Sequence, residues 1–187
     1  MNLPTSAEIE RASEVLEDGG IIAYPTEAVY GFGCDPFNLE AVQRLLDLKK
    51  RSAEKGFIVV ASDWSQLLPL VEPIPPQLLA KVQSTWPGPY TWIFPAKRSV
   101  SPLVCGNEGG IAARISAHPT IQLLCQLYGS AIISTSANQS GFPPARDYNT
   151  VKMLFGDFVD YILPGSVGAS LKPTEIWDAM SGELIRS

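Results

Sequence analysis

Apolar residues follow two spacings that alternate along the chain. Apolar positions three or four residues apart predict amphipathic helices, which we place at about residues 6–18, 39–48, 63–70, 77–84, 119–128 and 150–155. Short runs of β-branched and aromatic residues predict strands, which we place at residues 21–24, 57–61, 90–94 and 111–115, in a run that begins at residue 132, and at 159–163. A closing hairpin is predicted over residues 174–186.

The alternation of helices and strands indicates an α/β fold, with a mixed or largely parallel sheet and helices packed on it. A chain of 187 residues is long enough for one domain with its own core and short for two. We therefore expect a single domain over residues 1–187.

Three helix starts can be read from the sequence. Thr5 and Glu8 have the spacing of a capping box. Asn38 is suited to cap the next helix, with four leucine or valine residues on the buried side: Leu39, Val42, Leu45 and Leu46. Asn149 or Thr150 is expected to cap the last helix.

Residues 97–110 mix Ser, Pro, Gly and charge, which predicts an exposed loop.

Hydroxyl and amide side chains follow the strand that begins at Ile132. Ser134, Ser136, Asn138 and Ser140 lie two residues apart, so an extended backbone would direct them to one face. Ligands of open α/β sheets bind beyond such strand ends. The same residue types also form turns and helix caps without any ligand, and this stretch alone does not separate the two interpretations.

A second polar cluster follows the first predicted strand. Thr26 and Glu27 come directly after Pro25, and Gly31 and Gly33 allow another group to approach the backbone closely. The spacing is not that of the dinucleotide-binding GxGxxG pattern. A tight connection without a ligand is the alternative.

Positive charge is concentrated after the helix at residues 39–48. Lys49, Lys50 and Arg51 end this helix and Lys55 follows, which is more charge than a helix dipole needs. Arginine and lysine in a cleft are suited to a triphosphate.

Arg114 interrupts an apolar strand and must face a carboxylate or a ligand, because arginine is rarely buried unpaired. His118 before Pro119 fits a local structural role at a helix start.

The net charge of −5 argues against a protein that coats nucleic acid. The three cysteines lack CxxC spacing and predict reduced packing residues of a cytosolic protein. The single histidine excludes a His-rich metal site, and no apolar run reaches the length of a membrane span. The chain has neither a P-loop nor a GxSxG nucleophile elbow.

Six motifs occur in a fixed order: Tyr24-Pro25-Thr26-Glu27, Leu48-Lys49-Lys50-Arg51, Trp86-Pro87-Gly88-Pro89-Tyr90-Thr91, Ala113-Arg114 with His118-Pro119, Ser134 to Gly141, and Pro173-Thr174-Glu175-Ile176. This ordered set resembles the YrdC/Sua5 family, most closely its short bacterial TsaC type. The resemblance implies a twisted sheet with flanking helices around a concave basic cleft. It also implies synthesis of L-threonylcarbamoyladenylate and pyrophosphate from L-threonine, bicarbonate or CO2, and ATP, with Mg²⁺ bound to the ATP.

The resemblance also implies roles for individual residues. Lys49 and Arg51 would be catalytic through contacts with phosphate. The threonine substrate would be held by Thr26, Arg114, Ser134 and Thr174. The nucleotide would be held by Lys49, Arg51, Lys55, Thr91, Ser136, Asn138, Arg146 and Arg186. No protein-bound metal is expected, and we identify no general base. Residues 165–173 are a candidate for the loop that covers the cleft.

The resemblance also implies that the product would pass to a tRNA-modifying transferase complex in the cytoplasm, which modifies adenosine 37 of tRNA, and that the chain itself would bind tRNA weakly. A rival function is an RNA-binding module for ribosome maturation, supported by the Lys49–Lys55 cluster but opposed by the net charge and by the lack of exposed aromatic stacking motifs. A second rival is a carbamoyl-adenylate domain of the hydrogenase-maturation type. Such domains normally lie in a much longer chain with zinc-finger-like cysteines, which this sequence lacks.

Overall fold

The computed structural model describes residues 2–169 and 174–186. Its α-helices are α1 (Ser6–Glu17), α2 (Leu39–Lys49), α3 (Pro76–Ser84), α4 (Pro102–Cys105), α5 (Pro119–Tyr128) and α6 (Tyr148–Phe155), with short 3-10 helices η1 (Ala53–Lys55) and η2 (Trp64–Gln66). Its strands are β1 (Ile22–Pro25), β2 (Tyr30–Gly33), β3 (Ile58–Ala61), β4 (Tyr90–Pro95), β5 (Gly110–Ile115), β6 (Ile132–Ser136), β7 (Tyr161–Ile162), β8 (Glu175–Asp178) and β9 (Leu184–Arg186).

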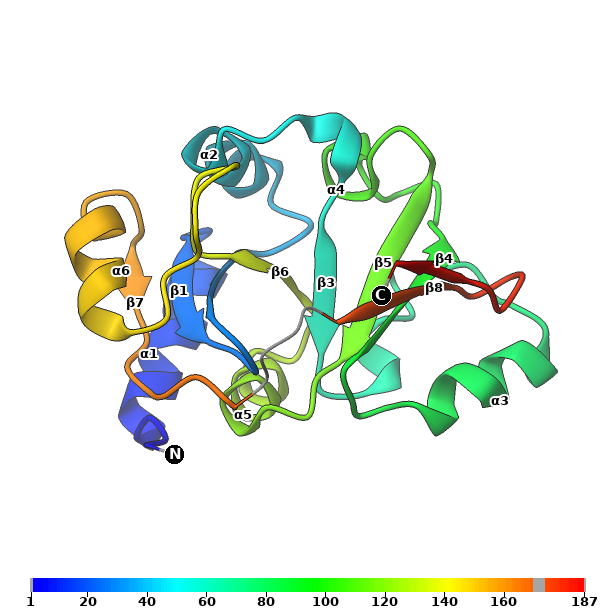
Figure 1. The fold of residues 1–187 in the computed structure, drawn as a ribbon, viewed down its shortest axis with the longest axis horizontal. Helices are drawn as coiled ribbons and strands as arrows, with labels where there is room; N and C mark the ends of the chain where they lie inside the picture. The colour runs from blue at the N-terminus through cyan, green and yellow to red at the C-terminus, as the bar shows by residue number, and fades with distance from the viewer. Residues whose placement is uncertain (1, 170–173, 187) are drawn as a thin grey trace.

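Within this part of the chain the nine strands form one sheet, in the order β7-β1-β2-β6-β3-β5-β4-β8-β9. Three neighbouring pairs are parallel, namely β1 with β7, β3 with β5, and β4 with β8, and the other pairs are antiparallel. The predicted mixed α/β sheet is therefore confirmed (Figure 1).

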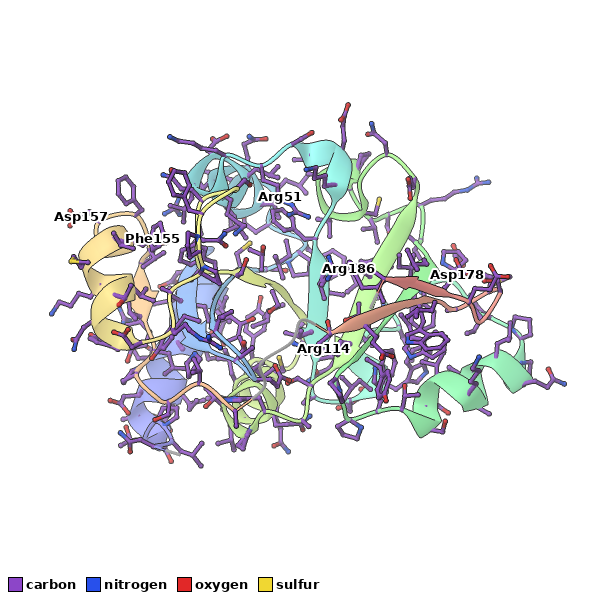
Figure 2. All side chains as sticks on the ribbon, in the orientation of Figure 1. Arg51, Arg114, Phe155, Asp157, Asp178 and Arg186 are labelled. Carbon is purple, nitrogen blue, oxygen red and sulfur yellow. The ribbon has the colours of Figure 1, made fainter. Side chains whose placement is uncertain are left out.

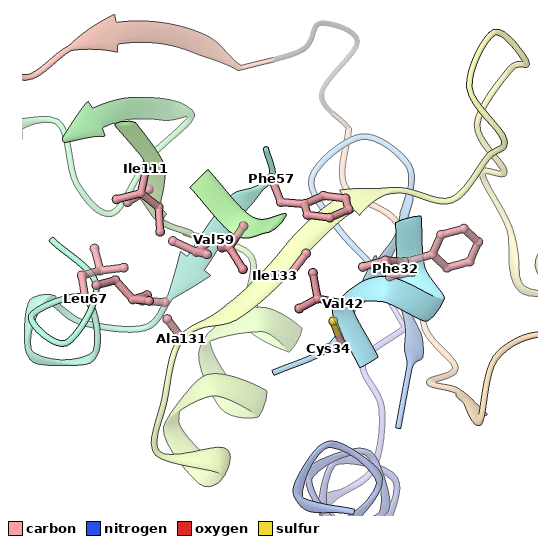
Figure 3. Close-up of a cluster of buried hydrophobic side chains, with 14 of the residues drawn as sticks. Phe32, Cys34, Val42, Phe57, Val59, Leu67, Ile111, Ala131 and Ile133 are labelled. Carbon is pink, nitrogen blue, oxygen red and sulfur yellow. The ribbon is translucent and has the colours of Figure 1, made fainter. Parts of the chain in front are cut away.

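The two faces of the sheet bury different side chains, because neighbouring residues of a strand point to opposite faces. Val60 and Ile132 pack with α1 and α5, whereas Val59 and Ile133 pack with α2. In Figure 1 α1 and α5 accordingly lie below the strands and α2 lies above them. Figure 3 shows the larger cluster, in which the side chains of Val42, Cys34 and Ile133 lie close together.

Strand β2 was missed by the sequence analysis, which placed only a connection after Pro25. Two of its four residues are glycines, which are poor strand formers. The structure requires Gly33, because a Cβ there would lie 2.8 Å from the carbonyl oxygen of Ile133 and 2.8 Å from Cε1 of Tyr24. The close approach that this glycine permits is therefore made by the protein's own chain.

Helix α2 starts at the predicted residue, but the face that it buries differs from the predicted one. Asn38 caps it by accepting a hydrogen bond of 3.1 Å from the backbone N–H of Ala41. Leu39 is 47% exposed, so its predicted burial is wrong. The buried stripe instead runs through Val42, Leu45 and Leu46 to Lys49, positions that share one helix face.

Three further local predictions are corrected. Helix α6 is capped by Asp147, whose carboxylate accepts from both the N–H and the hydroxyl of Thr150, rather than by Asn149 or Thr150. The helix expected at residues 63–70 is limited to η2. The loop predicted at residues 97–110 contains α4, whose Val104 is fully buried.

Candidate active site

A cavity of about 610 Å³ lies beside the ends of β1, β2, β5 and β6. Within the described residues its lining includes four arginines, Arg51, Arg114, Arg146 and Arg186, and one carboxylate, Glu27. Figure 2 shows Arg51, Arg114 and Arg186 in the central part of the molecule, where they come from different elements. This charge distribution favours anionic ligands.

Thr26 lies in the turn that joins β1 to β2. Its backbone N–H and its hydroxyl both donate to the carbonyl oxygen of Val29, at 3.0 and 2.7 Å. The residue is buried and lines the cavity. The turn thus fixes the hydroxyl while leaving its oxygen lone pairs available as acceptors.

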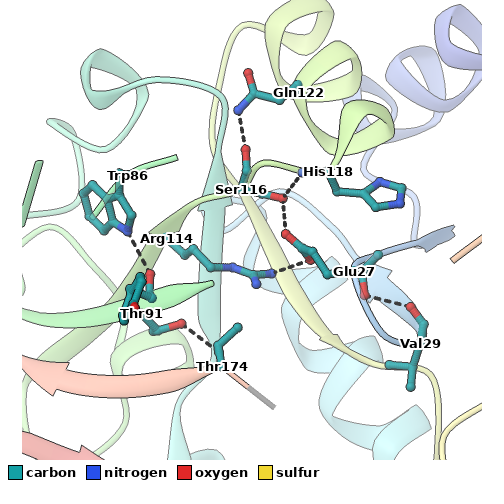
Figure 4. A network of polar contacts seen from close by, with 11 residues as sticks. Glu27, Val29, Trp86, Thr91, Arg114, Ser116, His118, Gln122 and Thr174 are labelled. Carbon is teal, nitrogen blue, oxygen red and sulfur yellow. Dashed lines mark hydrogen bonds and ion pairs between the residues drawn. The ribbon is translucent and has the colours of Figure 1, made fainter. Parts of the chain in front are cut away.

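Arg114 lies in β5 and faces a carboxylate, as the sequence predicted. Its Nη2 lies 3.2 Å from Oε2 of Glu27, and both side chains are largely buried. The other carboxylate oxygen of Glu27 accepts a hydrogen bond of 2.5 Å from the hydroxyl of Ser116. Ser116 in turn accepts from the backbone N–H of His118 at 3.0 Å. This network links β1, β5 and the start of α5 (Figure 4).

His118 is the N-cap residue of α5, but its side chain makes no capping hydrogen bond. Both ring nitrogens are buried and have no hydrogen-bond partner among the described residues. Burial lowers the pKa of His118, and the nearby Glu27 opposes this shift only in part. The imidazole is therefore neutral near pH 7.

Lys49 points into the protein, because it lies on the buried stripe of α2. Its ammonium donates to the backbone oxygens of Ser136 and Asn138 and to the side-chain oxygen of Asn138. It is not among the residues that line the cavity. Burial, aided by the charge of Arg51, lowers the pKa of Lys49 to about 8. The structure thus places this predicted phosphate ligand beneath the loop that follows β6.

Arg51 and Arg186 lie between the cavity and a second one of about 670 Å³, and they line both. Arg51 donates two hydrogen bonds to the carbonyl oxygen of Gly56, at 3.1 and 2.9 Å. Burial, followed by the nearby positive charge of Arg186, lowers the pKa of Arg51. Lys55 lines only the second cavity.

The other predicted site residues divide into cavity-lining and supporting positions. Thr174 lines the cavity, and its hydroxyl lies 3.1 Å from that of the fully buried Thr91. Arg146 lines the cavity and donates to the carbonyl oxygen of Ala28 at 3.3 Å. Thr91 therefore acts on the cavity through Thr174.

Ser134 and Ser136 line the cavity, but the predicted row of four side chains ends with them. Strand β6 stops at Ser136, and the chain then turns. The side-chain oxygen of Asn138 accepts hydrogen bonds from Ser136 and Lys49, at 2.6 and 3.2 Å. The side-chain amide of Asn138 therefore contacts Ser136 and Lys49 and does not extend the row of serine side chains into the cavity.

Sequence reasoning gave no role to Glu27, Ser116 or Gly168. The sequence indicated only that Arg114 must face a carboxylate or a ligand, and it did not identify Glu27 as that carboxylate. Gly168 donates its N–H to the carbonyl oxygen of Thr26 at 2.8 Å. A Cβ added at Gly168 would lie 2.5 Å from the carbonyl oxygen of Glu27. Of the loop proposed to cover the cleft, residues 170–173 lie outside the described residues.

Comparison with known proteins decides the family. The family model Sua5_yciO_yrdC, described as "Telomere recombination", matches residues 14–187. The chain belongs to this family.

Curated relatives match nearly end to end. A protein of Coxiella burnetii (strain RSA 493) named threonylcarbamoyl-AMP synthase is 52% identical over 178 residues, which are 95% of this chain and 96% of that protein. A protein of the same name from Vibrio parahaemolyticus is 46% identical over 179 residues, which are 95% and 97% of the two chains.

Solved structures share the fold. E. coli YciO has a TM-score of 0.85 at 25% identity, covering 100% of this chain and 91% of that one. P. abyssi Sua5 complexed with L-threonine has a TM-score of 0.84 at 29% identity, covering 91% and 50%. T. kodakarensis HypF has a TM-score of 0.79 at 20% identity, covering 95% and 23%, which shows the fold alone. None of the helices in residues 2–169 and 174–186 combines the length and the hydrophobicity that a bilayer crossing requires.

Proposed function

We propose that the chain is a threonylcarbamoyl-AMP synthase, a nucleotidyltransferase that supplies the activated threonylcarbamoyl group for the t6A modification of tRNA. The observation that carries this proposal is the near-complete match to relatives of that name. The cavity supports it, since it combines four arginines with neutral hydroxyl groups. Its substrates are L-threonine, bicarbonate or CO2, and ATP with its Mg²⁺.

The threonine substrate is assigned to the part of the cavity around Thr26, Arg114, Ser134 and Thr174. Arg114 offers a guanidinium for the substrate carboxylate, and the hydroxyl of Thr174, supported by Thr91, offers a short polar contact. P. abyssi Sua5, which shares this fold, has been solved complexed with L-threonine, which supports threonine as a substrate.

The triphosphate is assigned to the side where Arg51 and Arg186 lie between the two cavities. An anion bound between Arg51 and Arg186 would reduce the repulsion between the two guanidinium groups, so this position favours a phosphate. Lys55 extends the positive charge into the second cavity, and Ser136 and Arg146 border the first.

The reaction needs two bond-forming steps. The α-ammonium of threonine first gives a proton to solvent; the neutral amine nitrogen then bonds to the carbon of CO2 and gives a second proton to solvent, which leaves a carbamate. A carbamate oxygen then attacks the α-phosphorus of ATP, the bond to the β-phosphate oxygen breaks, and pyrophosphate leaves. Fixed arginines and neutral donors stabilise the charge in the second step without reorganisation. The product would pass to a tRNA-modifying transferase complex in the cytoplasm.

The proposal is tested by measuring pyrophosphate release by the purified protein with ATP, Mg²⁺ and bicarbonate, with and without L-threonine. We expect release only when threonine and bicarbonate are both present, together with a labile adenylate that contains threonine. Pyrophosphate release at the same rate with and without threonine would overturn the proposal. No release together with salt-sensitive RNA binding would favour an RNA-binding module.

A further inference from the structure

Glu27 is the one carboxylate among the described residues that line the first cavity, the one of about 610 Å³. The same cavity is lined by four arginines. A negative charge here weakens the attraction for ATP and bicarbonate, because both are anions. The carboxylate therefore needs a function that outweighs this effect.

The first function visible in the structure is to hold Arg114, through the 3.2 Å contact between Oε2 and Nη2. This contact and the hydrogen bond from Ser116 occupy one position on each carboxylate oxygen. A carboxylate has about four acceptor positions. Glu27 can therefore accept further hydrogen bonds from a ligand in the cavity, where its side chain is 21% exposed.

Of the proposed substrates, only L-threonine carries an ammonium group, and its nitrogen becomes the nucleophile once it has lost a proton. Its α-carboxylate and α-ammonium lie on one carbon, so a protein that binds the zwitterion needs a cation and an anion side by side. Arg114 and Glu27 are such a pair, and both line the cavity. Thr26 and Ser134, assigned to the same substrate, are neutral.

We propose that Glu27 binds the α-ammonium group of the amino acid substrate while Arg114 binds its α-carboxylate. The inference rests on the proposed function and adds a basis for selecting an amino acid over the corresponding hydroxy acid. Glu27 is held in place for this role, because Ser116 fixes one oxygen and is itself fixed by the backbone N–H of His118. Such fixed geometry lowers the entropic cost of binding.

The test compares two ligands by isothermal titration calorimetry: L-threonine and the 2,3-dihydroxybutanoate of the same stereochemistry, in which a hydroxyl replaces the amine. We expect the wild-type protein to bind threonine at least about tenfold more tightly than the hydroxy acid, as for a charge-assisted hydrogen bond of about 1.5 kcal/mol or more. Glu27→Gln should weaken threonine binding by a similar factor and change hydroxy acid binding by less than about twofold.

Two controls separate charge from shape. Ser116→Ala removes a hydrogen bond that holds Glu27 but removes no charge, so the preference for threonine should shrink by less than it does in Glu27→Gln. Glu40→Gln removes an exposed carboxylate on α2 and should leave both affinities unchanged. If Glu27→Gln weakens both ligands equally, Glu27 acts only by holding Arg114 and the proposal is wrong.

A wild-type protein that binds both ligands equally also contradicts the proposal, and this result needs no variant to fold. Threonine-dependent pyrophosphate release by the wild type is measured separately. An active enzyme without the predicted preference would thus overturn the role of Glu27 and leave the proposed function in place.

Discussion

At the scale of single residues, we expect Lys49 to support the loop after β6 structurally instead of contacting phosphate, because it does not line the cavity. Its ammonium donates to three oxygens of Ser136 and Asn138. Lys49→Met removes these three hydrogen bonds, although the backbone oxygen of Ser136 and the side-chain oxygen of Asn138 each keep one other donor, so we expect the free energy of unfolding to fall by about 2 kcal/mol. Pyrophosphate release should fall at least about tenfold, because Ser136 borders the cavity and loses its support. Urea denaturation and the pyrophosphate assay measure the two effects.

Lys50→Met is the matched control for this prediction. Lys50 is the exposed neighbour at the C-terminal end of α2, so its replacement removes the same charge without disturbing the loop. We expect nearly wild-type stability and activity. A Lys49→Met enzyme as stable and active as this control would contradict the structural role.

His118 predicts a dependence of stability on pH. Burial lowers its pKa in the folded protein below the ordinary value of 6.5. As the pH falls below 6.5, the unfolded chain therefore binds the proton first, and the free energy of unfolding decreases. Urea denaturation at pH 7.5, 6.5 and 5.5 should show a smaller decrease for His118→Leu than for the wild type. Equal pH dependence in the two proteins would show that the imidazole carries no such shift.

At the scale of elements, the N-cap of α2 supports the helix that carries Lys49. Asn38→Ala removes the side-chain acceptor for the N–H of Ala41, so the free energy of unfolding should fall by about 1 kcal/mol. Asn38→Asp keeps an acceptor oxygen at the same position and should remain close to wild type. Urea denaturation of the three proteins checks this, and equal losses in both variants would argue against the capping bond.

Most elements were predictable because their local patterns agree with their tertiary environment. Helix α1 has the capping box of Thr5 and Glu8 that its sequence predicts. Strand β2 escaped prediction because half of its residues are glycines; the sequence indicated a close approach to this backbone but not that β6 and Tyr24 make it. The cap of α6 was misplaced because Asp147, Asn149 and Thr150 are all suitable residue types, and only the geometry selects Asp147.

At the scale of the whole molecule, the cavity joins residues from Thr26 to Arg186. The sequence predicted several of its members, because polar residues at strand ends were expected to meet. The burial of Lys49 could have been inferred, since it continues the stripe of Val42, Leu45 and Leu46. The pairing of Glu27 with Arg114 could not, because 87 positions separate them and no local pattern links the turn after β1 to β5.

Arg186 gives the prediction that belongs to this scale, because the β8–β9 hairpin brings it to both cavities. Arg186→Ala removes a guanidinium from the assigned triphosphate position. We expect the KM for ATP to rise about tenfold and the KM for threonine to change by less than about twofold. Arg98→Ala, which removes an exposed arginine outside both cavities, is the matched control. Steady-state kinetics with each substrate varied in turn would contradict the assignment if both KM values rose equally.

The position of Arg186 also has a consequence during protein synthesis. Strand β9 pairs with β8, which pairs with β4, yet both strands of this hairpin are translated after every other part of the cavity wall. A growing chain can form the contacts among β1 to β6 while it still lacks the arginine that faces both cavities. Long-range pairing of this kind is a late and slow event in folding. The protein should therefore bind ATP only weakly until this hairpin has emerged from the ribosome and paired with β4.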